Sequence, residues 1–165
     1  PDSVTYLGCE AMSSCHRLET INIGKGVSYI HEWAIYSSSL KEINVDPENN
    51  CFADIDGVLY SKDFTEIYLY PNNKKDSEFY IPETVVTIKD GAFGNAKNLK
   101  KLHIGKNIKK IEINNFYEYV YEDYEPIDTV TPYEIYFYST EETWKSLFTE
   151  ISCLNDIDKS KIHFV

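Results

Sequence analysis

One segment occurs twice in this chain with most of its apolar positions unchanged. It reads VTYLGCEAMSSCHRLETINIGKG at residues 4–26 and VVTIKDGAFGNAKNLKKLHIGKN at residues 85–107. Aligned on V-x-x-I, further copies begin at Val27 and Ile108, so two of the three steps between copies are 23 residues and the middle step is 58. A fixed period of this kind indicates a solenoid, because each coil buries its apolar side only by stacking on its neighbours.

Each copy contains the same order of local elements. After V-x-x-I comes a short helical turn or loop, then a small residue, and then a strand-like L-x-x-I-x-I. The apolar positions of these strands are Leu18, Ile21 and Ile23, then Leu40, Ile43 and Val45, then Leu99, Leu102 and Ile104. We therefore expect apolar ladders that run through the stack, with Ile21, Ile43 and Leu102 one above another.

These repeated positions, with Cys15 in the small-residue position, resemble the repeat of the BspA-like leucine-rich-repeat proteins of bacterial cell surfaces. Residues 52–88 resemble an interrupted repeat of that family, and EIYFYSTEETWKSL, which ends at Leu147, resembles its terminal strand and helix. The resemblance implies an α/β solenoid, a right-handed β-rich leucine-rich-repeat coil with short helical turns, a β-hairpin insertion and a C-terminal capping helix. It also implies a secreted or cell-surface protein with an adhesion role.

The length of 165 residues fits one domain, and we assign residues 1–165 to it. Its repeats start near residues 4, 27, 85 and 108, a hairpin insertion occupies about 46–84, and a C-terminal cap occupies about 134–165. In the insertion, VLY and EIYLY flank the polar turn SKDFT, as in a hairpin. In the cap, Ser139 and Glu142 form a capping box, and Trp144 lies on an apolar stripe and is expected in the core. The N-terminus has no comparable cap, so we expect the C-terminal part of a longer protein.

The charge and hydropathy of the chain exclude several kinds of partner. Sixteen basic and 27 acidic residues give a net charge of −11, which repels phosphate backbones and anionic lipid surfaces. The longest apolar runs, such as IYLY at 67–70, have the length of strands and are too short to span a bilayer. We therefore expect no nucleic-acid partner and no membrane insertion.

Motifs for catalysis and metal binding are incomplete. His31 and Glu32 begin an H-E-x-x-H zinc motif, but Ile35 stands where the second His belongs. Asp156, Asp158 and Ser160 imitate part of a calcium loop that lacks its Gly and its closing Glu. We predict no enzyme activity, no metal and no cofactor. The four cysteines lack C-x-x-C spacing, and we favour free thiols, with Cys15 packed as a small hydrophobe.

The remaining candidates lie on the surface. In each L-x-x-I-x-I strand the residues between the apolar ones point outward, in successive rows on one face. These rows contain Thr20, Asn22, Glu42, Asn44, Lys101, His103, Glu134 and Tyr136. Two interpretations stay open, a recognition face and an ordinary hydrated sheet. Our candidate binding residues on this face are Glu42, Asn44, Lys101, His103 and Tyr136.

A second candidate surface is the segment NNFYEYVYEDYEP at residues 114–126, in which aromatic residues alternate with acids. Tyr117, Tyr119 and Tyr121 would share one side of a strand, either as a partner-binding arm or as a cover for the last coils. Together with the extracellular location and the adhesion role that the resemblance implies, these surfaces favour a non-enzymatic extracellular recognition or adhesion module. Its partner would be a host or bacterial surface protein or a glycan, and the acids favour a basic protein or a hydroxyl-rich sugar. The alternatives are an accessory domain of a larger secreted enzyme and a structural spacer.

Overall fold

The structure of the chain is a computed structural model, which describes residues 2–12, 15–35, 39–113, 115–116, 118–122, 125–148 and 157–165, with the backbone alone over 118–122 and 125–130. The helical elements are short: α1 spans Glu141–Ser146 and the 3₁₀-helix η2 spans Lys159–Lys161. The strands are β1 (Tyr6–Leu7), β2 (Thr20–Ile23), β3 (Tyr29–Ile30), β4 (Glu42–Val45), β5 (Phe52–Ile55), β6 (Val58–Ser61), β7 (Glu66–Leu69), β8 (Glu78–Tyr80), β9 (Thr87–Ile88), β10 (Lys101–Ile104), β11 (Lys110–Ile111), β12 (Glu118–Glu122), β13 (Glu125–Val130), β14 (Glu134–Phe137) and β15 (Ile162–Phe164).

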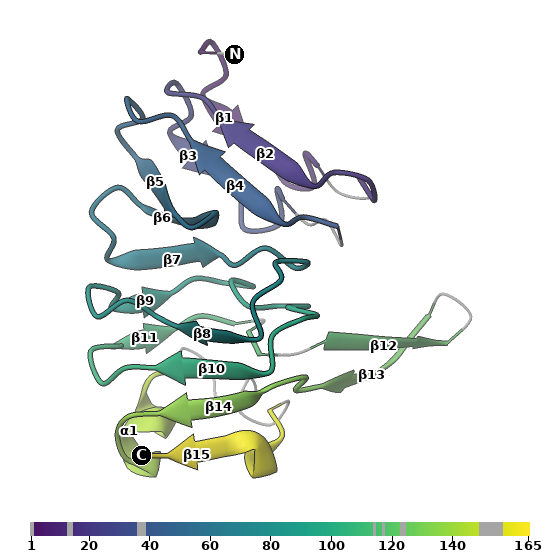
Figure 1. The fold of residues 1–165 in the computed structure, drawn as a ribbon, viewed down its shortest axis with the longest axis vertical. Helices are drawn as coiled ribbons and strands as arrows, with labels where there is room; N and C mark the ends of the chain where they lie inside the picture. Colours follow the sequence, from purple (N-terminus) through teal and green to yellow (C-terminus); the bar gives the residue numbers. More distant parts are fainter. Residues whose placement is uncertain are drawn as a thin grey trace.

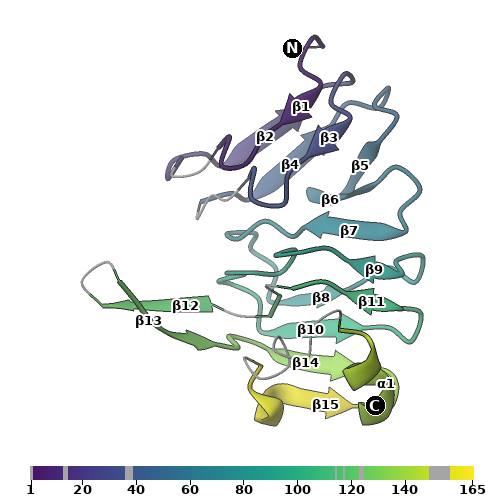
Figure 2. The same cartoon turned by 180° about the vertical axis from the view of Figure 1, so that it is seen from behind.

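The strands stack along the long axis of the molecule as a solenoid (Figure 1). The V-x-x-I strands lie on one side of the coils, in a β1–β3 sheet and a sheet with the order β11-β9-β7-β6-β5. The L-x-x-I-x-I strands lie on the other side, in a β2–β4 sheet and a sheet with the order β15-β14-β10-β8. Figure 2, the view from behind, shows the side of the coils that carries β9 and β11. The expected repeat solenoid is confirmed, with turns rather than helices in most connections.

The insertion between the second and third recognised repeats contains a complete coil. Its strand β7 pairs in parallel with β9, with Ile67 opposite Ile88, and its strand β8 pairs with β10, with Phe79 opposite Leu102. Thr65 O accepts hydrogen bonds from two successive backbone N–H groups of the next coil, just as Val86 O does one coil further on. Residues 65–81 are therefore a repeat of the solenoid and lie within the insertion expected at about 46–84.

Strands β5 and β6 are the true interruption of the stack. They pair antiparallel with each other, and β6 pairs antiparallel with β7, which confirms the expected hairpin around SKDFT. The β5–β6 turn contains Asp56 and Gly57, whose φ angles of 50° and 76° are those of a type I′ turn. An Asp-Gly pair between two apolar runs is a hairpin signal that is visible in the sequence.

The predicted common ladder of Ile21, Ile43 and Leu102 is wrong for its third member. Ile21 lies opposite Ile43 in the β2–β4 pair, but Leu102 lies opposite Phe79 and Ile135 in a different sheet. The reason is that the β5–β6 hairpin lies between the two stacks, since Gly57 O accepts a hydrogen bond from Ile43 N. The core is correspondingly divided into two clusters of buried side chains.

The C-terminal end differs from the expected cap in two respects. Helix α1 is six residues long, and its N-cap is Thr140, whose Oγ1 accepts from Thr143 N at 3.1 Å. The predicted Ser139–Glu142 box is therefore wrong, because the helix begins one residue later than that box requires. Trp144 is buried, as expected, with its ring 5.2 Å from that of Phe137. The sheet continues past the helix to β15, which pairs in parallel with β14.

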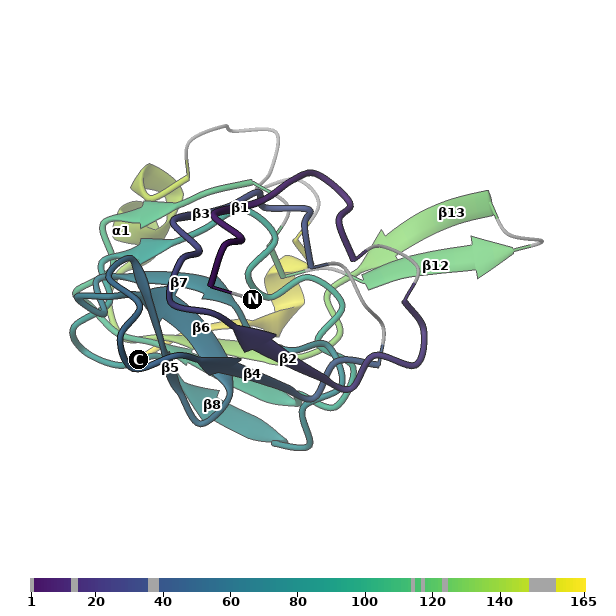
Figure 3. The same ribbon diagram turned by 90° about the horizontal axis from the view of Figure 1, so that it is seen from above.

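Strands β12 and β13 form an antiparallel hairpin that projects sideways from the stack (Figure 3).

Cys15 is exposed, so its expected packing as a small hydrophobe is wrong. Ala96, at the corresponding position of a later coil, is fully buried because coils cover it on both sides. None of the helices among the described residues is long and apolar enough to cross a membrane.

Candidate functional site

The outer face of the β8, β10, β14 and β15 sheet carries two regular rows of side chains. We call the first the charged row, because acid and base alternate in Glu78, Lys101 and Glu134 on successive strands and in Lys161, the residue before β15. We call the second the aromatic row, which contains Tyr80, His103, Tyr136 and His163 in direct register. Alternation along each strand places the apolar residues between these rows toward the core.

The rings of the aromatic row stack on one another. Centroids of Tyr80 and His103 are 3.9 Å apart, with an angle of 7° between the ring planes. The next two centroid distances are 4.9 Å from His103 to Tyr136 and 4.8 Å from Tyr136 to His163. Parallel strands lie about 4.8 Å apart, so one aromatic residue per strand at the same register stacks without distortion.

His103 connects the charged row and the aromatic row to Tyr138, the residue that follows β14. Its side chain is 8% exposed, its Nε2 lies 2.8 Å from Glu78 Oε1, and its Nδ1 lies 2.9 Å from the Tyr138 hydroxyl. An ionised carboxylate only accepts hydrogen bonds, so His103 donates from Nε2 to Glu78; when the ring carries no second proton, Nδ1 accepts from the Tyr138 hydroxyl. The hydrogen bond from His103 holds the pKa of Glu78 below its ordinary value.

Glu134 occupies the equivalent place one strand further along. Lys161 Nζ donates to its Oε1 at 2.9 Å, and His163 Nε2 lies 2.7 Å from its Oε2. The hydrogen bonds from Lys161 and then His163 lower the pKa of Glu134. On the other side of the row, Lys101 Nζ lies 6.0 Å from the centroid of the Tyr136 ring, within the range of a cation–π contact.

A pocket of about 580 Å³ opens at the ends of β8 and β10, where both strands turn toward the opposite side of the coil. Tyr80 and Tyr138, which flank it, are 60% and 39% exposed. It is lined by Tyr80, Ile81, Pro82, Glu83, Val85, His103, Gly105, Lys106, Asn107, Ile108 and Tyr138. The pocket is thus continuous with the aromatic row through Tyr80 and His103.

The structure brings together three of the predicted binding residues, Lys101, His103 and Tyr136. Glu42 and Asn44 lie instead on β4, beside a separate polar hollow of about 580 Å³, where Asn44 Nδ2 donates to Asn22 Oδ1 at 3.3 Å. They are separated from the other three because the β5–β6 hairpin divides the stack. Tyr119 and Tyr121 lie on β12, whose side chains are not described, and Tyr117 lies outside the described residues.

Sequence reasoning missed Glu78, Tyr80, Tyr138 and His163. The first two belong to the coil hidden in the insertion, and the pattern F-Y-I-P at residues 79–82 was the available signal. His163 lies on β15, a strand that follows the recognised repeats.

No group of three or more His, Cys, Asp or Glu within the described ranges could hold a metal ion. Asp158 caps η2 by accepting from Ser160 N at 2.9 Å, and Asp156 lies outside those ranges.

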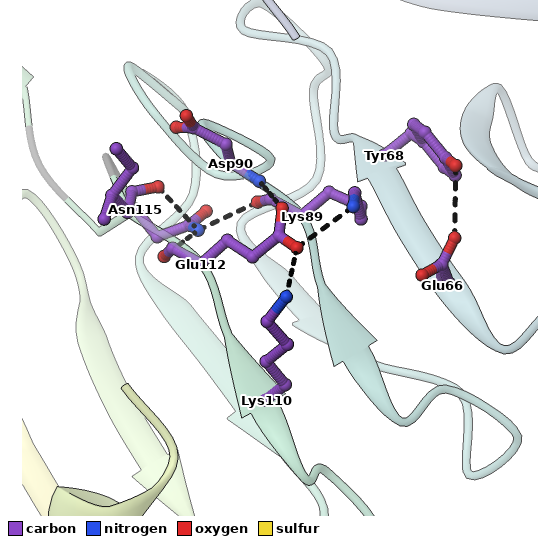
Figure 4. A network of polar contacts seen from close by, with 8 residues as sticks. Glu66, Tyr68, Lys89, Asp90, Lys110, Glu112 and Asn115 are labelled. Carbon is purple, nitrogen blue, oxygen red and sulfur yellow. Dashed lines mark hydrogen bonds and ion pairs between the residues drawn. The ribbon is translucent and has the colours of Figure 1, made fainter. Parts of the chain in front are cut away.

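A second polar cluster, on the V-x-x-I side, joins adjacent coils (Figure 4). Glu112 accepts from Lys89 Nζ at 3.0 Å, from Lys110 Nζ at 2.7 Å and from Asp90 N at 3.2 Å. Partial burial acts to raise the pKa of Glu112, but the hydrogen bonds from Lys110 and Lys89 lower it overall. Asn115 donates to Lys89 O and accepts from Phe93 N. Because these groups bind one another, we interpret the cluster as structural.

Comparison with known proteins agrees with this architecture. Residues 1–76 and 64–162 match the model of the BspA type leucine rich repeat region, with six copies of the repeat. The chain belongs to the BspA-type leucine-rich-repeat family. The overlap of the two matches includes residues 65–76, in the coil that the structure revealed in the insertion.

Solved structures of bacterial proteins share the fold of this BspA-type chain. A leucine-rich repeat protein from Eubacterium ventriosum is 27% identical, with a TM-score of 0.67 over 84% of this chain and 35% of its own. A leucine rich cell surface protein from Faecalibacterium prausnitzii is 16% identical, with a TM-score of 0.58 over 91% of this chain and 62% of its own. The pneumococcal vaccine antigen PcpA is 17% identical, with a TM-score of 0.50 over all of this chain and 67% of its own. The chain thus spans about a third of the length of the E. ventriosum protein, and no curated protein matches it.

Proposed function

We propose that this chain is a recognition and adhesion module that binds a surface protein or a glycan through the outer face of the β8, β10, β14 and β15 sheet. The observation that carries the proposal is the aromatic row, whose Tyr80 is 60% exposed beside a pocket. A hydrated face needs only polar side chains, whereas exposed tyrosines leave apolar area in contact with water. Tyrosine rings supply large contact areas with little loss of conformational entropy, and such residues often dominate binding energy.

An extracellular, cell-surface location is part of this proposal. Its support is the BspA-type family and the cell-surface protein of F. prausnitzii with the same fold. The net charge of −11 disfavours nucleic acids and anionic lipids as partners. Acid and base alternate in the charged row, so the row adds little net charge to the face. The face therefore repels neither a positively nor a negatively charged partner.

The role that we propose is non-enzymatic, although Glu78, His103 and Tyr138 follow the carboxylate–imidazole–hydroxyl order of a hydrolytic triad. The hydroxyl that His103 contacts is the phenol of Tyr138, and the ring centroids of the two residues are 5.9 Å apart. We assign the hydrogen bonds among Glu78, His103 and Tyr138 the role of orienting Tyr138. Release of p-nitrophenol from p-nitrophenyl acetate by the wild type, abolished in His103→Gln, would contradict this assignment.

The test is a binding screen of the 165-residue chain against extracellular matrix proteins and a neutral and acidic glycan array. A double variant, Lys101→Ser with Tyr136→Ser, changes the face outside the pocket, and we expect it to lose at least about tenfold in affinity for any partner found. Tyr29→Ser is the matched control, because Tyr29 is 47% exposed and stacks on Tyr6 at 5.0 Å on the other side of the coils. Equal affinities of the double variant and the wild type would remove this face from the function.

A further inference from the structure

The pocket beside the aromatic row arises from one missing side chain. The register of the sheet continues past the strand ends, so Pro82, Gly105 and Tyr138 follow β8, β10 and β14 in adjacent positions. A Cβ placed on Gly105 would have no neighbouring heavy atom within 4 Å, and its φ lies outside the left-handed region. Gly105 is therefore not required by the backbone, and its effect is to leave a gap between Pro82 and Tyr138.

From this geometry, and resting on the proposed function, we propose that the pocket at Gly105 binds one neutral pyranose ring of a glycan. Pro82 and Tyr138 follow strands that are two spacings apart in the sheet, which corresponds to about 9.6 Å between their backbones. A ring in van der Waals contact with a wall on each face requires about 7–8 Å. The pocket of about 580 Å³ is also in the common range for small-ligand sites, about 300–1,000 Å³.

The polar groups around this gap suit a ligand with many hydroxyl groups. His103 is nine-tenths buried, and its Nδ1 lies 2.9 Å from the Tyr138 hydroxyl. In the tautomer that donates to Glu78 from Nε2, Tyr138 donates to Nδ1, and the lone pairs of the Tyr138 oxygen accept from a ligand. At the mouth, Asn107 Nδ2 donates to Glu83 O at 3.0 Å, which leaves its amide oxygen as an acceptor. A pyranose has apolar C–H faces for the tyrosine rings and hydroxyl edges for these groups.

The charges at the mouth favour a neutral ligand. The lining contains one acid there, Glu83, and one base, Lys106. A cationic ligand would require an excess of carboxylates, and a phosphate or carboxylate ligand would require an excess of basic groups. Binding of a neutral sugar should accordingly be insensitive to ionic strength, whereas a basic peptide would bind more weakly as salt rises.

The experiment is a titration of the ¹⁵N-labelled 165-residue chain with the methyl pyranosides of glucose, galactose, mannose and N-acetylglucosamine, followed by amide chemical shifts. We expect at least one sugar to shift the Gly105 and Lys106 amides, with a Kd on the order of 1 mM. Gly105→Leu fills the gap and should weaken that sugar at least about tenfold at an unchanged melting temperature. Tyr138→Phe keeps the ring, removes the hydroxyl, and should weaken it several-fold, whereas Tyr29→Ser should bind as the wild type does.

The proposal is overturned if none of the four sugars shifts these amides, or if the Gly105→Leu variant binds as the wild type does. If the leucine lowers the melting temperature, Tyr138→Phe decides, and unchanged affinity in that variant is the contrary result. Shifts caused by a tetra-arginine peptide alone, and lost in high salt, would assign the pocket to a basic protein. The proposed recognition function is tested separately by the binding screen. Partners whose binding depends on Lys101 and Tyr136 would still be found there if the pocket binds no sugar.

Discussion

His103 is the residue on which the most contacts of the face converge. It stacks between Tyr80 and Tyr136, and both of its ring nitrogens have hydrogen-bond partners although its side chain is 8% exposed. A buried imidazole with both nitrogens bonded holds one tautomer and one orientation. The surrounding tyrosines therefore keep fixed positions before any ligand arrives, which lowers the entropic cost of binding.

Replacing His103 should affect stability and the order of the face together. His103→Ala removes two hydrogen bonds, leaves a gap in the aromatic row, and should lower the free energy of unfolding by about 2 kcal/mol. His31→Ala is the control, because His31 is partly exposed and lies on the other side of the coils. Urea unfolding measures both, and equal midpoints for the two variants would contradict the role assigned to His103.

Glu112 yields a pH prediction whose sign follows from its pKa. The pKa is lower in the folded chain than its ordinary value of 4.5, so the carboxylate stabilises the fold above that value, and the stabilisation is lost as the pH falls through the folded pKa. Glu112→Gln should be less stable than the wild type at pH 7, and the difference should shrink below about pH 4.5.

Thermal unfolding of the wild type and Glu112→Gln between pH 7 and pH 3 provides the measurement. The comparison cancels the general effect of titrating a chain with a net charge of −11, because both proteins share it. A difference in melting temperature that stays constant or grows toward pH 3 would show that Glu112 is not held by Lys89 and Lys110 as the structure describes.

At the scale of elements, β6 has the most unusual environment. Val58, Leu59 and Tyr60 are all at most 1% exposed, although neighbouring residues of a strand point to opposite faces. Leu59 belongs to the core cluster of the first coils, and Val58 and Tyr60 belong to the cluster of the later coils. Strand β6 is thus buried on both faces and joins two stacks that do not share a sheet on the L-x-x-I-x-I side.

This arrangement predicts that two adjacent substitutions act on different halves of the molecule. Leu59→Ala should cost about 2–5 kcal/mol, mainly in the stack that contains β2 and β4, and Val58→Ala should act mainly on β7 to β10. Hydrogen exchange of the backbone amides resolves the two halves, since repeat proteins open locally as well as globally. The same protection pattern in both variants would mean that the solenoid unfolds as one unit.

The ladder of β8, β10, β14 and β15 predicts a contrast between neighbouring positions. Leu102 is fully buried between Phe79 and Ile135, so Leu102→Asp should cost about 3 kcal/mol or more and unfold a domain of ordinary stability. Lys100→Asp is the matched control, because Lys100 is exposed two residues away. Equal melting temperatures for these variants in circular dichroism would contradict the ladder.

For the whole molecule, the arrangement of two stacks around the β5–β6 hairpin decides where binding surfaces form. The hairpin separates Glu42 and Asn44 on β4 from Lys101, His103 and Tyr136 on the later sheet. The face that remains continuous spans four strands, and one end of it adjoins the pocket at Gly105. The β12–β13 hairpin extends away from the stack, as Figure 3 shows, so it offers a separate surface to the surroundings.

A local period in the residues was sufficient to predict the solenoid and its apolar positions, because burial on one side of each coil repeats whenever the coil repeats. The apolar stripe of the C-terminal helix was sufficient to predict the burial of Trp144. The pairing of Leu102, the coil at 65–81 and the site around His103 depended on the tertiary structure. His103 meets Glu78 and Tyr138 from 25 and 35 residues away, at distances set by which strands are neighbours. Strand neighbours follow from long-range packing around the β5–β6 hairpin, and a repeat pattern whose middle step is 58 residues instead of 23 does not encode where such a hairpin inserts.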